Sequence, residues 1–182
     1  MKTKRAPRQV GQYAGMLAIL MLAFCLRVYR LDHQSLWWDE IKTGALTVVP
    51  LRTLFDKLFT IRNHVPLYFL LVRAWAWIGR ADFVLRFFSV LWGVAGVALI
   101  YRAGTLAGGA RVGCLSALLL AVSPLHIWYS QEARMYTLVC ASTLAAGWLL
   151  LRWLRTRSTR TCAPHTCAPH ALIGYGICML VA

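Results

Sequence analysis

The chain contains several apolar runs that are too long for the interior of a small soluble domain. Residues 11–29, 84–103 and 112–130 come close to the ~20 residues that cross about 30 Å of hydrocarbon as a helix, and residues 135–151 are slightly fewer. Of the 182 residues, 59% are hydrophobic and 14% are charged, whereas charged residues make up about 25% of soluble domains. The sequence therefore predicts an all-α, multi-pass membrane protein.

A long segment, residues 30–83, separates the first two runs, and we expect it to lie against the membrane surface. One part of it has apolar residues at helical spacing and polar residues on the other face, which predicts an interfacial amphipathic helix; the apolar positions are Leu51, Leu54, Phe55, Leu58 and Phe59. Pro50 can open this helix. The run 66–79 holds Arg73 and only fourteen residues, so we expect it to dip into the membrane rather than cross. Four tryptophans suit the headgroup level: Trp37, Trp38, Trp75 and Trp77.

The distribution of basic residues predicts the orientation. Twenty Lys and Arg face six Asp and Glu, yet they form no single stripe of the kind that binds nucleic acid. They cluster at the N-terminus, at 102–111 and at 152–160. If residues 66–79 do not cross, these clusters share one side, which the positive-inside rule makes cytoplasmic. We therefore expect a cell-membrane protein with a cytoplasmic N-terminus, and residues 30–83 and 131–134 outside.

The two ends of the chain allow other readings. The basic N-terminus and the apolar stretch after it resemble a signal peptide ending at Cys25, but bulky Phe24 precedes that position and no A-x-A pattern follows, which favours an uncleaved span. Residues 161–170 repeat Thr-Cys-Ala-Pro-His twice; they could ligate zinc, but overlapping proline-containing units would close poorly, so we expect no metal. We expect residues 171–182 to begin a fifth span of a longer domain.

The positions of the six acidic residues are informative because acids are scarce in this chain. Asp39 and Glu40 follow two tryptophans, and Glu132 ends a span beside Arg134. An acid at membrane depth costs about 2.5–3.5 kcal/mol on insertion scales, so such residues usually mark a functional cavity. Two structural alternatives stay open: Glu132 pairs with Arg134 as an anchor, and the acidic pair is a solvated helix start.

Four motifs resemble those of the GT-C membrane glycosyltransferases, in the branch of protein O-mannosyltransferases, aminoarabinose transferases and rhizobial core transferases. They are Leu-Trp-Trp-Asp-Glu at 36–40, His-Val-Pro-Leu-Tyr at 64–68, Arg86 with Ser89 to Gly93, and Ser-Pro-Leu-His-Ile-Trp-Tyr-Ser-Gln-Glu-Ala-Arg-Met-Tyr at 123–136. The resemblance covers about residues 16–152. It implies that residues 1–182 are the N-terminal part of a GT-C-type bundle. It also implies transfer of a sugar, without a cofactor, from a polyprenyl-phosphate donor to a glycan, lipid or protein hydroxyl at the extracytoplasmic face.

The resemblance also implies roles for individual residues. Asp39 would be the general base that takes the acceptor's proton as its oxygen attacks the anomeric carbon with inversion, and Glu40 would orient the acceptor or share that role. Arg86 and Arg134 would bind the phosphate through bidentate contacts, although arginines near span ends also serve as snorkelling anchors.

The remaining expected substrate-binding residues are His64, Glu132 and Tyr136. His64 belongs to a motif that reads His-Pro-Pro-Leu in the family and lies near the donor; Val65 replaces its first proline here, which leaves the imidazole available. An unpaired loop histidine is the alternative.

Two competing functions remain. A transporter would place its acids at mid-membrane, whereas the acids here fall at the expected outer face and Ser123-Pro124 is the one candidate helix break. An inactive, truncated relic of a transferase would keep the same motifs. We therefore favour the glycosyltransferase.

Overall fold

The computed structural model describes residues 6–60 and 65–159, and every regular element within them is an α-helix. The helices are α1 (Ala6–Val28), α2 (Trp38–Leu46), α3 (Leu51–Thr60), α4 (Pro66–Trp75), α5 (Asp82–Gly108), α6 (Ala110–Val122), α7 (Pro124–Ser130) and α8 (Tyr136–Thr159). The prediction of an all-α membrane protein is confirmed. His64, the repeat at 161–170 and the expected fifth span at 171–182 lie outside the described residues.

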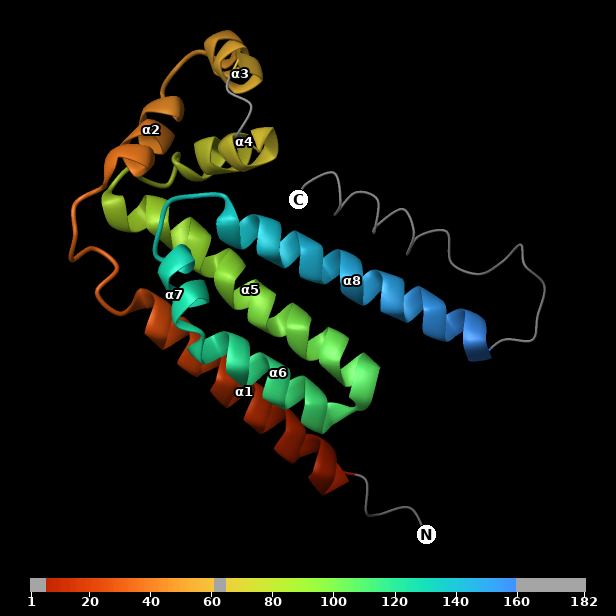
Figure 1. The fold of residues 1–182 in the computed structure, drawn as a ribbon. Coiled ribbons are helices and arrows are strands. Elements are labelled where there is room, and N and C mark those ends of the chain that lie inside the picture. The colour runs from red at the N-terminus through yellow and green to blue at the C-terminus, as the bar shows by residue number, and fades with distance from the viewer. Residues whose placement is uncertain (1–5, 61–64, 160–182) are drawn as a thin grey trace.

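Helix α5 is the centre of the bundle. Helices α6 and α1 pack along one side of it and α8 along the other, while α2, α3 and α4 gather beyond its N-terminal end (Figure 1). An apolar cluster of Ala23, Val97, Ala117 and Ala121 joins α1, α5 and α6. A second cluster, which includes Leu54, Tyr68, Val72, Phe88 and Leu138, seats α3 and α4 against α5 and α8. The helices at the α2–α4 end are therefore fixed on the bundle.

Two helices, α5 and residues 136–156 of α8, are long and apolar enough to cross a membrane. Helices α6 and α7 together make a third candidate, but a bend of 62° separates them. The bend falls at Pro124, which starts α7, because the residue before a proline is driven out of the helical region and Ser123 is extended, with ψ 117°. The expected span 112–130 is thus a broken helix. The apolar part of α1, Tyr13–Val28, is a shorter helix.

The segment between α1 and α5 forms short helices, as its periodicity predicts. Helix α3 follows Pro50 and buries Leu54 and Leu58, and α4 has only 10 residues, too few to cross hydrocarbon. Trp77 is 90% exposed and is free to anchor in a headgroup layer. Trp75 differs from that expectation, since it stacks near Phe87 and donates a hydrogen bond of 2.8 Å to the Val84 carbonyl oxygen.

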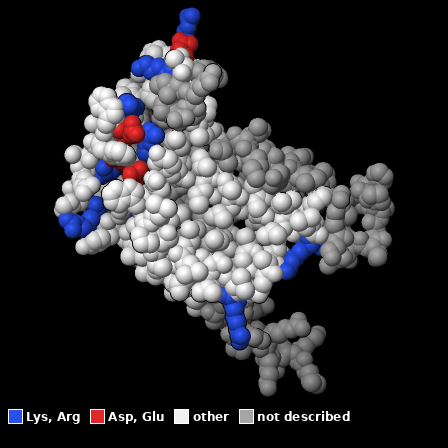
Figure 2. Space-filling view, in the orientation of Figure 1, with Lys and Arg blue, Asp and Glu red and all other residues white. Residues whose placement is uncertain are grey.

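Charged side chains occupy the two ends of the bundle, with an uncharged band between them on the face shown in Figure 2. The acids on that face lie at the α2–α4 end. All six acidic residues belong to segments of that end: Asp32, Asp39, Glu40, Asp56, Asp82 and Glu132. The opposite end carries the α5–α6 turn and the end of α8, whose charged residues are arginines. An uncharged band between two charged ends is what a membrane span requires.

Helices α5 and α6 approach closely through small residues. A Cβ added to Gly113 would lie 2.2 Å from Thr105 Oγ1 and 2.8 Å from the Tyr101 carbonyl oxygen. Without a hydrophobic driving force between helices, such backbone proximity is a main source of packing energy in lipid.

We expect Gly113→Ala to lower the free energy of unfolding by about 1–3 kcal/mol, the usual cost of overpacking. SDS titration of the protein in mild detergent measures it. Gly15→Ala is the matched control, because a Cβ there meets nothing within 4 Å. Equal stability of the two variants would contradict the close α5–α6 contact.

Candidate active site

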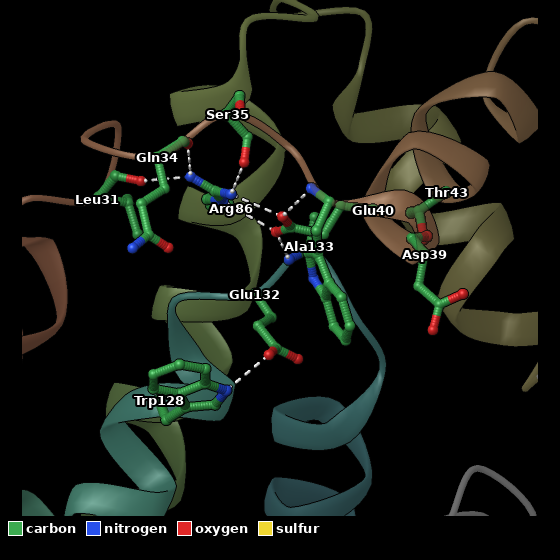
Figure 3. Close-up of polar contacts among 11 residues, drawn as sticks. Leu31, Gln34, Ser35, Asp39, Glu40, Thr43, Arg86, Trp128, Glu132 and Ala133 are labelled. Carbon is green, nitrogen blue, oxygen red and sulfur yellow. Dashed lines mark hydrogen bonds and ion pairs between the residues drawn. The ribbon is translucent and has the colours of Figure 1, made fainter.

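The two adjacent acids stand in the first turn of α2, where negative charge favours the helix dipole. Trp37 is extended and starts the helix, and the Glu40 carboxylate accepts a hydrogen bond of 3.3 Å from its backbone N–H. Because successive helical residues point about 100° apart, the two carboxylates face different surroundings. Figure 3 shows Asp39 pointing away from Glu40 and its partner Arg86.

Arg86, on α5, forms a buried ion pair with Glu40. Its Nε and Nη2 atoms donate to the two carboxylate oxygens at 2.9 and 2.6 Å, the bidentate geometry of a strong charge-assisted pair. The remaining donors reach backbone carbonyl oxygens, those of Leu31 at 2.9 Å, Gln34 at 2.7 Å and Ser35 at 3.3 Å. A guanidinium has five N–H donors, and all five are therefore used within the protein (Figure 3).

Glu40 is equally saturated. Besides Arg86 and Trp37, it accepts a hydrogen bond of 2.8 Å from the Ala133 backbone N–H, and its side chain is fully buried. The pair consequently ties together the loop before α2, helix α2, helix α5 and the connection between α7 and α8. Three of the four sequence motifs meet at this point.

Arg134, in the connection between α7 and α8, makes far fewer contacts than Arg86. It is only 8% exposed, yet its Nη2 atom is 4.0 Å from Asp39 Oδ2, beyond hydrogen-bond distance. Its Nε atom has no hydrogen-bond partner among the described residues. The guanidinium also lies over the ring of Tyr136, 5.7 Å from the ring centroid. A buried, positively charged donor with a loose counter-ion is suited to bind an anion.

The backbone of Arg134 is fixed by α5. Ser89 Oγ donates to the Arg134 carbonyl oxygen at 3.3 Å, and Thr137 Oγ1 donates to the Ser89 carbonyl oxygen at 3.0 Å. Tyr68 of α4 is buried nearby, and its hydroxyl has no hydrogen-bond partner within residues 6–60 and 65–159. Burial raises the pKa of Tyr68, so the phenol stays neutral and can donate to an incoming oxygen.

Asp39 keeps an accessible carboxylate. Its side chain is 36% exposed, and Lys42 Nζ approaches Oδ1 at 3.5 Å from the next turn of α2. It therefore has what Glu40 lacks, namely oxygen atoms that can take a proton from a ligand without breaking a buried pair.

Glu132 faces a different space from Arg134. Its Oε1 accepts a hydrogen bond of 2.7 Å from Trp128 Nε1, and no ion pair with Arg134 occurs in the described part of the chain; the anchoring pair considered from the sequence is not formed. It lines a cavity of about 690 Å³ with Trp37, Trp128 and Gln131. Partial burial raises the pKa of the Glu132 carboxyl, against the opposing effect of the Trp128 hydrogen bond.

The structure places six of the seven sequence-predicted site residues at the α2–α4 end, in two groups: Asp39, Arg134 and Tyr136 lie near one another, while Glu132 lines the cavity with Glu40 and Arg86. His64 is outside the described ranges. Sequence reasoning passed over Arg27, which is fully buried in α1. An arginine inside an apolar run was the available signal, because ionisable residues at that depth usually have a function.

The fold and these motifs define a membrane glycosyltransferase of the GT-C class. Comparison with protein families specifies it further: the family model for dolichyl-phosphate-mannose-protein mannosyltransferases matches residues 63–179, and the chain belongs to that family. Neither the curated proteins nor the solved structures gave a match. The matched range contains Arg86, Glu132, Arg134 and Tyr136, while Asp39 and Glu40 precede it.

We expect Glu40→Ala to lower the free energy of unfolding by about 3–5 kcal/mol, because it leaves the buried Arg86 charge unpaired. Lys42→Ala, which breaks an exposed pair in the same helix, should cost less than about 1 kcal/mol. SDS titration in mild detergent compares the two. If the Glu40 variant were as stable as the Lys42 variant, the buried pair would not organise this end.

Proposed function

We propose that the chain transfers a sugar from a polyprenyl-phosphate donor to an acceptor hydroxyl at the extracytoplasmic membrane face. Family membership supports the mannosyltransferase type of reaction. The observation that carries the proposal is the pairing of an accessible carboxylate, Asp39, with a nearly buried and loosely paired guanidinium, Arg134, 4.0 Å away. A single displacement at a sugar phosphate needs a base for the acceptor hydroxyl and an anion-binding group for the departing phosphate, and this end of the bundle offers one of each.

In this mechanism Asp39 takes the proton of the acceptor hydroxyl while that oxygen bonds to the anomeric carbon. The bond from the anomeric carbon to the phosphate oxygen breaks, and the polyprenyl phosphate leaves with the bonding electrons. Arg134 stabilises the charge that develops on the phosphate, where a fixed donor in a dry site acts most strongly. The anomeric configuration is inverted.

Every hydrogen-bonding position of the Glu40–Arg86 pair is used within the protein. This distinguishes the two acids and the two arginines, whose roles the sequence left open. Because Glu40 accepts four hydrogen bonds and Arg86 donates five, neither is free for substrate. We assign both to positioning, with Asp39 as the base and Arg134 as the phosphate ligand. The ring of Tyr136, over which the Arg134 guanidinium lies, supports that guanidinium.

Glu132 and His64 complete the proposed site. The Glu132 carboxyl, beside Trp128 in the cavity, offers a polar group and an aromatic surface of the kind that orients a ligand. By its place in the second motif, we propose that His64 also contacts the donor.

The charge distribution supports the orientation. The end opposite the proposed site carries arginines and no acid, among them Arg102, Arg111, Arg152 and Arg155, and the described chain begins there with α1 (Figure 1). The positive-inside rule places this end in the cytoplasm of a cell-membrane protein.

Single-cysteine labelling in a cysteine-depleted background tests this orientation. Trp77→Cys, at a site 90% exposed, should react with an impermeant maleimide from outside, and Leu154→Cys, at a site 48% exposed, should react only from the cytoplasm. The reverse pattern would rule out the proposed face.

Asp39→Asn keeps the size of the side chain but removes the proton acceptor, so turnover should fall by about 10²–10⁴ with little change in donor affinity. Arg134→Gln should instead raise the KM for the polyprenyl-phosphate sugar. Asp56→Asn, at an exposed acid of α3, is the control and should change neither. Near-normal turnover of the Asp39 variant would remove it as the base.

A further inference from the structure

Arg27 is a fully buried arginine near the end of α1, and none of the acids in the described residues pairs with it. Its five donors are nevertheless all used. Nη1 donates to the carbonyl oxygens of Ala23 at 2.9 Å and Ala121 at 3.1 Å, Nη2 to Leu120 O at 3.2 Å and His126 Nδ1 at 2.8 Å, and Nε to Ser130 Oγ at 3.2 Å.

The break between α6 and α7 explains this arrangement. The last carbonyl groups of a helix lack intrahelical partners and carry a partial negative charge. Ser123 N–H reaches the Leu120 carbonyl oxygen only at 3.4 Å, and Pro124, the next residue, has no N–H to offer these groups. Arg27 supplies both N–H donors and positive charge to Leu120 and Ala121, so the end of α6 takes the place of an acidic partner.

The capping is reciprocal. Gln131, which follows α7, donates from Nε2 to the carbonyl oxygens of Arg27 at 3.2 Å and Tyr29 at 3.0 Å. Arg27 is in the last turn of α1, and Tyr29 directly follows the helix. Ser130 links the two halves, because its Oγ accepts from Arg27 and donates to the His126 carbonyl oxygen at 2.6 Å. We call Arg27, Ser130 and Gln131 the reciprocal cap.

Helix α5 closes the space around this cap. A Cβ added to Gly93 would lie 2.4 Å from Ser130 Oγ and 3.2 Å from Arg27 Nε. A glycine in the third sequence motif therefore permits the contact. A substitution at Gly93 can also disturb the cap without replacing any of its members.

We propose that Arg27 is a positioning residue for the sugar transfer. The reciprocal cap ends at Gln131, and the next residues, Glu132 to Arg134, bring the Ala133 N–H to Glu40 and the guanidinium of Arg134 to Asp39. The cap holds α7 against α1 and so fixes where the connection between α7 and α8 begins. It thereby sets the position of Arg134, the residue proposed to bind the phosphate. The effect of Arg27 on donor binding rests on the proposed function. Its effect on the position of residues 132–134 does not.

Hydrogen–deuterium exchange tests the structural link without any activity. The Ala133 amide, which donates to Glu40, should exchange about tenfold faster or more in Arg27→Gln and in Gly93→Ala, because local opening becomes easier. Gly147→Ala, where a Cβ meets nothing within 4 Å, is the matched control and should exchange at the wild-type rate. Unchanged exchange in folded Gly93→Ala and Arg27→Gln would overturn the proposal.

Transfer kinetics test the functional link. Both variants should raise the KM for the polyprenyl-phosphate sugar by about tenfold, more than they change kcat or the acceptor KM, and Arg27→Lys should recover only part, since an ammonium has three donors. Equal losses in every parameter would show a merely structural role. If the wild type transferred no sugar from this donor, the proposed function would fail while the exchange result stood.

Discussion

The buried pair of Glu40 and Arg86 is the interaction on which the α2–α4 end of the molecule depends. Removing two charges from water costs several kcal/mol for each ion, and their attraction offsets this only if the remaining donors and acceptors are satisfied as well. Here the satisfaction is complete, and it draws on backbone groups of the loop before α2 and of the α7–α8 connection. Segments more than ninety residues apart must therefore come together. The pair makes the end of the bundle a defined structure rather than a set of separate loops.

This constraint separates two acids that the sequence presents as equivalent. Glu40 points inward, and its oxygen atoms accept hydrogen bonds from within the protein. Asp39, one helical position earlier, stays accessible beside Arg134. A base that must gain and lose a proton in each cycle cannot also hold a buried arginine, because protonation would leave that charge unpaired. The same reasoning divides Arg86 from Arg134. A guanidinium with five protein partners holds the structure, and one with an unpartnered Nε can hold a ligand.

The sequence predicted the helices well because their causes are local. Long apolar runs, the helical spacing from Leu51 to Phe59 and Pro50 before it describe how a segment meets lipid and water, and α1, α3, α5 and α8 follow those patterns. It could not distinguish the roles of Arg86 and Arg134, since their difference lies in the hydrogen bonds of Arg86 to residues 46 to 55 positions away in the chain. It predicted one span over residues 112–130 and noted Ser123-Pro124 only as a candidate helix break, whereas a bend of 62° separates α6 from α7. Arg27 was missed because three of its five acceptors are backbone carbonyl groups, whose positions a sequence does not reveal.

The use of carbonyl groups as counter-charges has a consequence for the whole chain. A buried arginine normally calls for a nearby acid, and an acid deep in the bundle would carry its own cost of burial. Arg27 lies at the C-terminal end of α6, whose carbonyl groups supply the negative charge that an acid would otherwise supply. All six acids can therefore lie at the α2–α4 end. A transporter would need acids along a path through the spans, and the described spans offer none beyond Asp82 at the start of α5. The acids are instead concentrated at the α2–α4 end, where we propose that the acceptor hydroxyl meets the lipid-phosphate sugar.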